Sequence, residues 1–226
     1  MLEKKANMLN VFISGQKYFG MLILHEMIKN ENVKVIGVCA PAEDKYIGRL
    51  ASVHEIPIIC AGMLNGETMP ENVDVGITAH SFDYIGKKTR SRAKIGWVGY
   101  HPSLLPRHRG KSSIEWAIKM RDFLTGGTTF WLNSGIDRGN IIEQEVVWID
   151  PKLYAIDTRQ AAKILWENEL QDIGVRLINK AINDIINKSI KSTPQDARFS
   201  TFEPSLDTKD IYRPDLLMIG PGKKSN

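Results

Sequence analysis

The sequence predicts an α/β fold, a doubly wound domain with a mainly parallel sheet. The chain has 226 residues, enough for one well-buried domain with a short appendage. Over its first two thirds, short apolar runs alternate with segments of helical periodicity. Strands that alternate with helices form βαβ units, and such units build parallel sheets. A long helical pattern follows them.

The first elements follow from apolar runs and the residues that interrupt them. Leu22, Leu24 and Ile28 recur at roughly helical spacing after the first run. Pro41 ends the second run, and Pro57 places the third at a sheet edge because proline cannot donate to a ladder. Strands are expected at 10–14, 33–39, 56–59, 73–78 and 95–99, and helices at 18–29, 44–54 and 85–93.

The remaining elements follow a turn that contains Asp137. Strands are expected on both sides of it, at 128–132 and 141–149, and the longest helical pattern covers 158–188. After Lys191, prolines and glycines interrupt the sequence, and no helical or strand periodicity of apolar residues is sustained. The predicted organisation is a flexible N-terminal extension (1–8), a folded domain (9–190) and an irregular C-terminal arm and tail (191–226).

Composition narrows the function classes. The chain is 42% hydrophobic and 25% charged, as expected of a soluble globular protein, and its net charge of +4 comes from scattered lysines and arginines. No apolar run approaches the ~20 residues of a membrane span, and the N-terminus lacks the pattern of a signal peptide. Cys39 and Cys60 have no metal or redox spacing and end apolar runs, so both are expected to be buried thiols. A cytoplasmic protein without membrane partner or metal is expected.

The segment from Gly99 to Gly110 is the most informative part of the chain. Pro102 and Pro106 remove backbone donors and stiffen the loop that follows an apolar strand. Open α/β sheets place their ligands at the carboxyl ends of such strands. His101 therefore occupies a position where an imidazole would be used in chemistry. His108, which lies between two arginines, is expected at the loop surface.

The same segment resembles the signature of formyltransferases that use 10-formyltetrahydrofolate. That signature reads Asn-x-His-Pro/Gly-Ser-Leu-Leu-Pro, followed by Arg-Gly, a Thr-Gly-x-Thr strand and an Asp near a Gly. The chain has these as His101 to Pro106, Arg109-Gly110, Thr125 to Thr128 and Asp137. The resemblance covers about residues 9–205 and implies a Rossmann-like formyltransferase domain with a cis Leu105–Pro106 peptide.

The resemblance assigns catalysis to His101 and Asp137. Formyl transfer needs a group that takes a proton from the attacking amine and returns one to the leaving nitrogen. A histidine supported by a carboxylate does both, because the carboxylate favours the charged imidazole.

Gly99 departs from the family pattern, which has a catalytic Asn there. The Asn donates to the formyl oxygen, and losing one such donor costs on the order of 10²–10³ in kcat. Three explanations stay open: another donor (a backbone N–H, protonated His101, Tyr100 or His80), a slow but specific enzyme, or a site that only binds.

The resemblance also implies two binding sites. The co-substrate 10-formyltetrahydrofolate would contact Asp83, Tyr84, Ile85, Trp97, Leu104, Ser134, Gly135 and Ile136. The acceptor would contact Gly15, Gln16, Lys17, Ser103, Arg109 and Gly110. Core packing accounts equally well for Trp97 and Leu104, a plain tight turn accounts for Gly15 to Gly20, and the Ser103 hydroxyl is suited to fix the loop.

The expected acceptor is a small, nucleotide-like amine. Methionyl-tRNA formyltransferase has a long basic loop after its second strand and a C-terminal barrel, whereas this chain has only Pro41 to Leu50 there and little sequence after residue 205. We therefore expect no tRNA partner, and a homodimer is compatible with the sequence. Two alternatives are a hydrolase that deformylates the folate and a folate-binding module without turnover.

Overall fold

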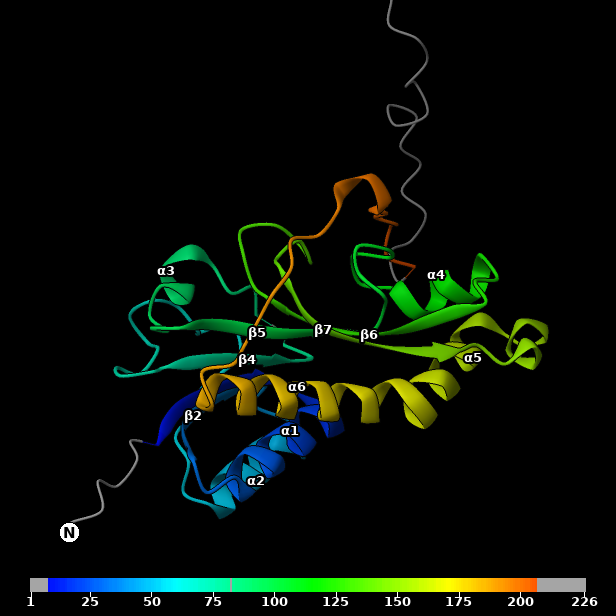
Figure 1. The fold of residues 1–226 in the computed structure, drawn as a ribbon. Helices are drawn as coiled ribbons and strands as arrows, with labels where there is room; N and C mark the ends of the chain where they lie inside the picture. Colours follow the sequence, from blue (N-terminus) through cyan, green and yellow to red (C-terminus); the bar gives the residue numbers. More distant parts are fainter. Residues whose placement is uncertain (1–7, 82, 207–226) are drawn as a thin grey trace, which may run out of the picture.

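The computed structural model describes residues 8–81 and 83–206 and contains a seven-stranded sheet (Figure 1). Its strand order is β3-β2-β1-β4-β5-β6-β7. The strands are β1 (Leu9–Gly15), β2 (Val33–Ala40), β3 (Ile58–Cys60), β4 (Val75–Ala79), β5 (Gly96–His101), β6 (Leu124–Trp131) and β7 (Ile141–Trp148). β1 to β5 pair in parallel, and β6 and β7 are antiparallel to their neighbours. The doubly wound, mainly parallel α/β prediction is confirmed.

Helices cover both faces of this sheet. They are α1 (Lys17–Lys29), α2 (Ile47–Val53), α3 (Lys87–Arg90), α4 (Ser113–Lys119), α5 (Thr158–Leu165) and α6 (Gln171–Ile186). Helices α1, α2 and α6 lie on one face, and α3 and α4 on the other (Figure 1). A π-helical turn, Trp166–Leu170, joins α5 to α6, so the long predicted pattern is almost continuous.

Each face of the sheet has its own apolar cluster. Val11 and Ile13 of β1 pack with α1 and α6, whereas Phe12 between them points to the opposite cluster. This alternation follows from the period of two along a strand. On that second side Trp97 packs edge-on against Phe12, with ring centroids 6.1 Å apart. A Cβ at Gly76 would lie 2.1 Å from the indole, so glycine makes room for it.

Several sequence-based expectations differ from the structure. The helix expected at 85–93 is the single turn α3, and α4 lies where we predicted no helix. Cys39 is buried as expected, but Cys60 is exposed because β3 is a three-residue strand at the sheet edge. The proposed extension at 1–7 and the tail from 207 onward lie outside the described residues.

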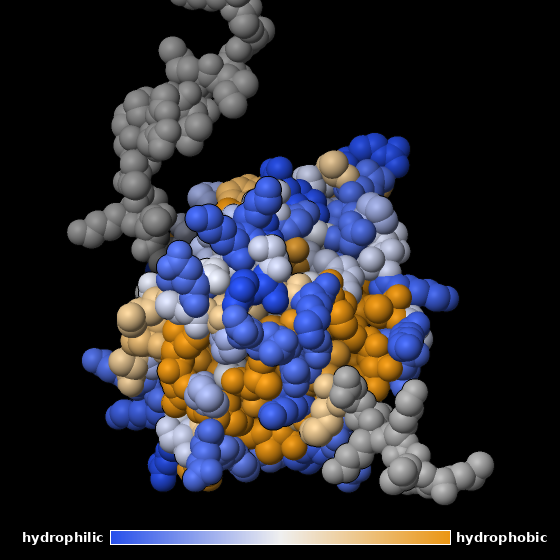
Figure 2. Space-filling model, turned by 90° about the vertical axis from the view of Figure 1, so that its left-hand side faces the viewer, coloured by the Kyte–Doolittle hydropathy of each residue, from blue (hydrophilic) through white to orange (hydrophobic). Residues whose placement is uncertain are grey.

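The topology locates a crevice at one end of the sheet. The chain winds from β1 outward to β3 and then returns to β4 on the other side of β1. Ligands of doubly wound sheets bind beyond the carboxyl ends of the strands at such a reversal. The opposite end, where the parallel strands begin, has apolar patches separated by hydrophilic residues (Figure 2). Among the described residues, no helix is long and apolar enough to cross a membrane.

Candidate active site

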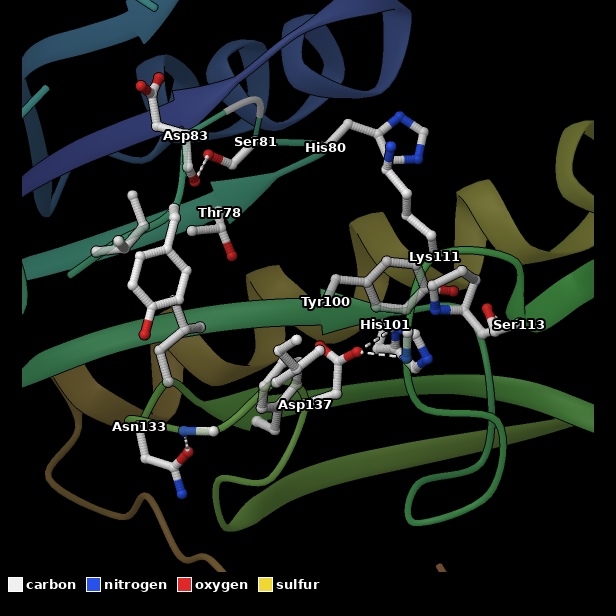
Figure 3. Close-up of a pocket in the computed structure, with 18 residues that line it drawn as sticks. Thr78, His80, Ser81, Asp83, Tyr100, His101, Lys111, Ser113, Asn133 and Asp137 are labelled. Carbon is white, nitrogen blue, oxygen red and sulfur yellow. Dashed lines mark hydrogen bonds and ion pairs between the residues drawn. The ribbon is translucent and has the colours of Figure 1, made fainter. Parts of the chain in front are cut away.

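A pocket of about 350 Å³ lies at the carboxyl ends of β4 and β5 (Figure 3). Residues from four parts of the chain line it, within 78–81 and 83–85, 100–102, 110–113 and 130–137. Eight of the sequence-predicted site residues are among the lining residues: Asp83, Tyr84, Ile85, His101, Gly110, Gly135, Ile136 and Asp137. The structure therefore brings most of the predicted catalytic and folate residues to one place.

His101 is the last residue of β5 and is 6% exposed. Its Nε2 lies 2.7 Å from the backbone oxygen of His108. A carbonyl only accepts hydrogen bonds, so Nε2 carries the proton and Nδ1 is the unprotonated nitrogen of the neutral ring. Nδ1 lies 3.6 Å from Asp137 Oδ2. The free ring nitrogen thus lies beside a carboxylate that stabilises the imidazolium.

Asp137 is held in a tight turn. Its φ of 51° lies in the left-handed region, which aspartate tolerates better than most residues. Oδ2 accepts a 2.8 Å hydrogen bond from the backbone N–H of Gly110. A Cβ at Gly139 would lie 1.4 Å from the carbonyl oxygen of Trp131, so only glycine allows this turn. The carboxylate is fixed toward His101 by both contacts.

Gln195, in the C-terminal arm, ties the Asp137 turn to the loop that contains Arg109. Its Nε2 donates 2.8 Å hydrogen bonds to the carbonyl oxygens of Asp137 and Gly139. Its Oε1 accepts from Arg109 Nε at 3.2 Å and Nη2 at 2.7 Å. Arg109 is therefore engaged in the protein and does not line the pocket. The irregular sequence around Gln195 carried no signal of this role.

The loop from Ser103 to His108 is anchored by buried hydrogen bonds. Ser103 Oγ donates to the backbone oxygen of Arg107 at 2.6 Å, and Thr128 Oγ1 donates to that of Ser103 at 2.6 Å. Ser103 is fully buried behind the pocket and fixes the loop. The Leu105–Pro106 peptide is cis, as the resemblance implied.

His108 is buried, and our prediction of a surface residue is wrong. Its Nε2 lies 2.7 Å from Asp122 Oδ2, and its Nδ1 lies 3.2 Å from Glu203 Oε1 of the arm. Burial would raise the pKa of Asp122, but hydrogen bonds from His108 and Arg107 outweigh it and hold that pKa below its ordinary value. The residues that bury His108 lie far from it in the sequence, so the arginines on either side of it gave no sign of burial.

The predicted folate residues form two walls. Tyr84, 72% exposed, and Ile136, 55% exposed, lie on opposite loops of the pocket. The Asp83 carboxylate accepts from the Gly62 N–H at 2.6 Å and from Cys39 Sγ at 3.2 Å, so only its backbone can serve a ligand. Burial, followed by the hydrogen bond to Asp83, raises the pKa of the Cys39 thiol.

Three predicted folate residues do not line the pocket. Trp97 is 1% exposed and belongs to the core, where packing accounts for it. Leu104 packs against Gly126, at which a Cβ would lie 2.7 Å from Leu104 Cδ2. Ser134 lies beside the pocket, and its backbone oxygen is 3.5 Å from the Tyr84 hydroxyl.

The turn Gly15 to Lys17 adjoins the pocket from another side. The backbone N–H of Gln16 donates to the carbonyl oxygen of Ala79 at 3.2 Å, and a Cβ at Gly15 would lie 2.7 Å from this carbonyl oxygen. Lys17 lines a second hollow of about 480 Å³, which we call the Lys17 hollow. Its other lining residues are Tyr18, Phe19, Tyr46, His80, Trp166, Glu167 and Gln171. His80 lines both cavities, so the hollow and the pocket are adjacent.

His80 separates the two cavities as an uncharged ring. It stacks on Trp166, with ring centroids 4.6 Å apart and an interplanar angle of 25°. Desolvation and then the charge of Lys17 lower the pKa of His80 to about 4. Its imidazole is neutral at physiological pH.

Comparison with known proteins matches the middle of the chain to one domain family. Residues 63–169 match the formyl transferase domain family, and this stretch contains the whole loop, His101 and Asp137. The matched stretch ends before Gln195 and Glu203, so the contacts of the arm lie beyond it.

Similar formyltransferase-domain proteins differ in what they are named for. A methionyl-tRNA formyltransferase of Azobacteroides pseudotrichonymphae is 30% identical over 208 residues, 84% of this chain and 61% of that protein. A mitochondrial 10-formyltetrahydrofolate dehydrogenase of Mus musculus is 29% identical over 211 residues, 87% of this chain and 22% of that protein. The chain thus spans less than two thirds of the length of either relative.

A solved structure shows the same fold. The N-formyltransferase from Helicobacter canadensis, in complex with folinic acid and dTDP-3-aminofucose, has a TM-score of 0.69 and 22% identity. The match covers 89% of this chain and 73% of that one. Among the described residues, no cluster of three or more His, Cys, Asp or Glu side chains could hold a metal ion.

Proposed function

We propose that this protein transfers the formyl group of 10-formyltetrahydrofolate to the amine of a small, nucleotide-like substrate. The observation that carries this proposal is the His101–Asp137 pair, 3.6 Å apart at the pocket. The pair combines an unprotonated ring nitrogen with a carboxylate fixed by the Gly110 N–H. The match of residues 63–169 to the formyl transferase domain family supports the same chemistry.

The roles of the pair follow from the bonds that change. When bound, 10-formyltetrahydrofolate supplies an activated formyl carbonyl. His101 Nδ1 accepts the proton that the amine loses as its nitrogen bonds to the formyl carbon. Asp137 stabilises the resulting imidazolium, which returns the proton to N10 of the folate as the N10–carbon bond breaks. The products are the formamide and tetrahydrofolate, so atoms and charge balance.

The pocket fits a flat folate ring system. Tyr84 and Ile136 present apolar side chains on its two sides, and Leu132 and Phe130 line the region between them and β5. The Asp83 carboxylate is turned away, and the carbonyl oxygens of Asp83 and Ile85 accept hydrogen bonds from Ser81 Oγ at 3.0 Å and Arg90 Nη1 at 2.7 Å. Polar ring edges would therefore pair with the remaining backbone groups of residues 83–85. Ligand pockets combine apolar walls with few polar groups in this way.

The Lys17 hollow fits the acceptor. It combines the ammonium group of Lys17 with the aromatic rings of Tyr18, Tyr46 and Trp166. A cation beside aromatic side chains suits a phosphate joined to a base. Because His80 borders both cavities, an acceptor in this hollow would direct its amine toward His101.

The comparisons do not support the expected exclusion of tRNA. Methionyl-tRNA formyltransferases are among the relatives, so methionyl-tRNA belongs in any acceptor screen. The relatives named 10-formyltetrahydrofolate dehydrogenase keep deformylation as the second candidate.

The decisive experiment measures binding and turnover together on the full chain. Calorimetry would follow 10-formyl-5,8-dideazafolate, a stable folate analogue. Turnover of 10-formyltetrahydrofolate would be measured with an amino-sugar nucleotide, glycinamide ribonucleotide and methionyl-tRNA, and products identified by mass spectrometry. We expect equal amounts of tetrahydrofolate and a formylated small amine. Release of formate with no formylated amine would identify a hydrolase. Folate binding without turnover would identify a folate-binding module. Formylated tRNA would correct the substrate class, and absence of folate binding would refute the proposal.

A further inference from the structure

Gly99 leaves a space that a neighbouring hydroxyl occupies. Gly99 on β5 pairs with Thr78 on β4. A Cβ at Gly99 would lie 3.1 Å from Thr78 Oγ1, 3.1 Å from Phe130 Cε1 and 2.6 Å from Leu132 Cδ1. The Thr78 hydroxyl therefore lies beside the point where a side chain at position 99 would begin. Figure 3 shows it pointing into the pocket from β4.

Thr78 is the pocket hydroxyl that remains available. The hydroxyl side chains that line the pocket are Thr78, Ser81, Tyr84, Tyr100 and Ser113. The other four reach backbone oxygens of Asp83, Ser134, Leu170 and Pro102, at 3.0, 3.5, 2.6 and 3.3 Å respectively. Within residues 8–81 and 83–206, Thr78 Oγ1 has no such bond. Hydroxyl groups that face a cavity without a protein partner are suited to donate to a ligand.

The three side chains considered for the missing donor are engaged elsewhere. The Tyr100 hydroxyl is 2.6 Å from the backbone oxygen of Leu170. His101 uses Nε2 on the loop, and its Nδ1 is needed for the proton of the amine. His80 is stacked on Trp166 at the border of the Lys17 hollow.

We propose that the Thr78 hydroxyl donates a hydrogen bond to the formyl oxygen and so replaces the family Asn. The inference rests on the proposed formyl transfer. As the amine nitrogen bonds to the formyl carbon, the carbonyl electron pair moves onto oxygen, and the Thr78 O–H donates to that oxyanion. The electron pair on oxygen re-forms the carbonyl bond when the N10–carbon bond breaks. Thr78 keeps its own proton throughout.

The first test removes the hydroxyl without changing the shape of the side chain. Thr78→Val should lower kcat about 100-fold, as expected for loss of one oxyanion donor, and Thr78→Ser should stay within about threefold of wild type. Thr125→Val is the matched control, because the buried Thr125 hydroxyl on β6 has no partner among the described residues. It should leave kcat unchanged. A Thr78→Val enzyme as fast as wild type would overturn the inference.

A binding measurement separates a donor from a merely structural residue. Wild-type protein should prefer 10-formyl-5,8-dideazafolate over 5,8-dideazafolate, which lacks the formyl oxygen. Thr78→Val should reduce this preference at least threefold and leave affinity for 5,8-dideazafolate unchanged. An equal loss of affinity for both analogues would show a packing role and overturn the inference. This readout needs no acceptor.

A side-chain exchange tests the shared space directly. Gly99→Asn alone should lower kcat, because the new side chain meets Thr78, Phe130 and Leu132. Thr78→Ala should also be slow. The double variant Thr78→Ala/Gly99→Asn should have a kcat at least tenfold above that of Thr78→Ala. Removal of the Thr78 hydroxyl makes space for the asparagine side chain at position 99, whose amide can then donate to the formyl oxygen. No recovery of kcat in a folded double variant counts against the inference.

If wild type neither binds folate nor transfers formyl, the proposed function fails. An active wild type with an equally active Thr78→Val refutes only the role of Thr78 as donor.

Discussion

The loop of residues 101–110 and the Lys17 hollow adjoin the same pocket, but they are held in different ways. The loop is largely buried and is tied to β6 by the Thr128 hydroxyl, which donates to the Ser103 backbone oxygen, and to the C-terminal arm by His108 and Arg109. The hollow is lined by exposed aromatic side chains, with Tyr18 47% and Tyr46 48% exposed. The side assigned to proton transfer is rigid, and the side assigned to the acceptor has surface residues that can be exchanged without affecting the core.

The largest effect should come from the catalytic side. His101→Ala should lower kcat about 10³-fold, because general acid–base groups contribute about 10²–10⁴. Folate affinity should change little, whereas the melting temperature should fall, because the 6% exposed side chain donates a buried hydrogen bond to the His108 carbonyl oxygen. His54→Ala, at an exposed position, is the control. A nearly normal rate in His101→Ala would remove the histidine from the mechanism.

Asp137→Asn should be the next most damaging change, with kcat lower by about 10². The amide oxygen can still accept from the Gly110 N–H, and asparagine tolerates the positive φ, so the turn is preserved. Only the negative charge beside His101 is lost. Steady-state kinetics together with circular dichroism would check this, and a rate equal to wild type would show that the charge is not used.

Gln195→Ala tests whether the arm positions the rigid side. The variant loses the contacts that join Arg109 to Asp137, so kcat should fall about tenfold with KM for folate nearly constant. Unfolding free energy should fall by about 1 kcal/mol. Arg198→Ala, an arm residue whose side chain is 83% exposed, should match wild type in both measurements. Equal effects of the two variants would assign the arm no catalytic role.

Tyr46→Ala tests the exchangeable side. It removes one aromatic wall of the Lys17 hollow, so KM for the acceptor should rise about fivefold, while folate affinity and kcat stay near wild type. Isothermal titration with each ligand would separate the two. A change in folate affinity instead would place the acceptor elsewhere.

The smallest expected effect is a pH dependence of stability. His80 has a folded-state pKa of about 4, against about 6.5 unfolded, so the unfolded chain binds more protons between these values. His80 should therefore make the protein less stable as pH falls from 6.5 to 4. Between pH 6.5 and 4, the melting temperature should fall less in His80→Asn than in wild type, and asparagine also suits the positive φ at this position. A His54→Asn control should show the wild-type dependence of melting temperature on pH. The same dependence in wild type and His80→Asn would contradict the lowered pKa.

Sequence reasoning reached the features that depend on local pattern. Apolar periodicity predicted the strands and the long helix, and two prolines and a histidine located the loop. It could not reach features set by strand register or by distant contacts. Thr78 faces Gly99 only because β4 pairs with β5, and His108 is buried only because Asp122 and Glu203 meet it from 14 and 95 residues away. Gln195 lies in a segment without periodicity, so nothing marked it.

The backbone at Asp137 limits how this site can change in evolution. With φ at 51°, substitution by most residues strains the turn as well as removing the charge. Asparagine is the exception, because it accepts the same conformation. Asp137→Asn is therefore the single substitution that best keeps the turn intact while removing the charge.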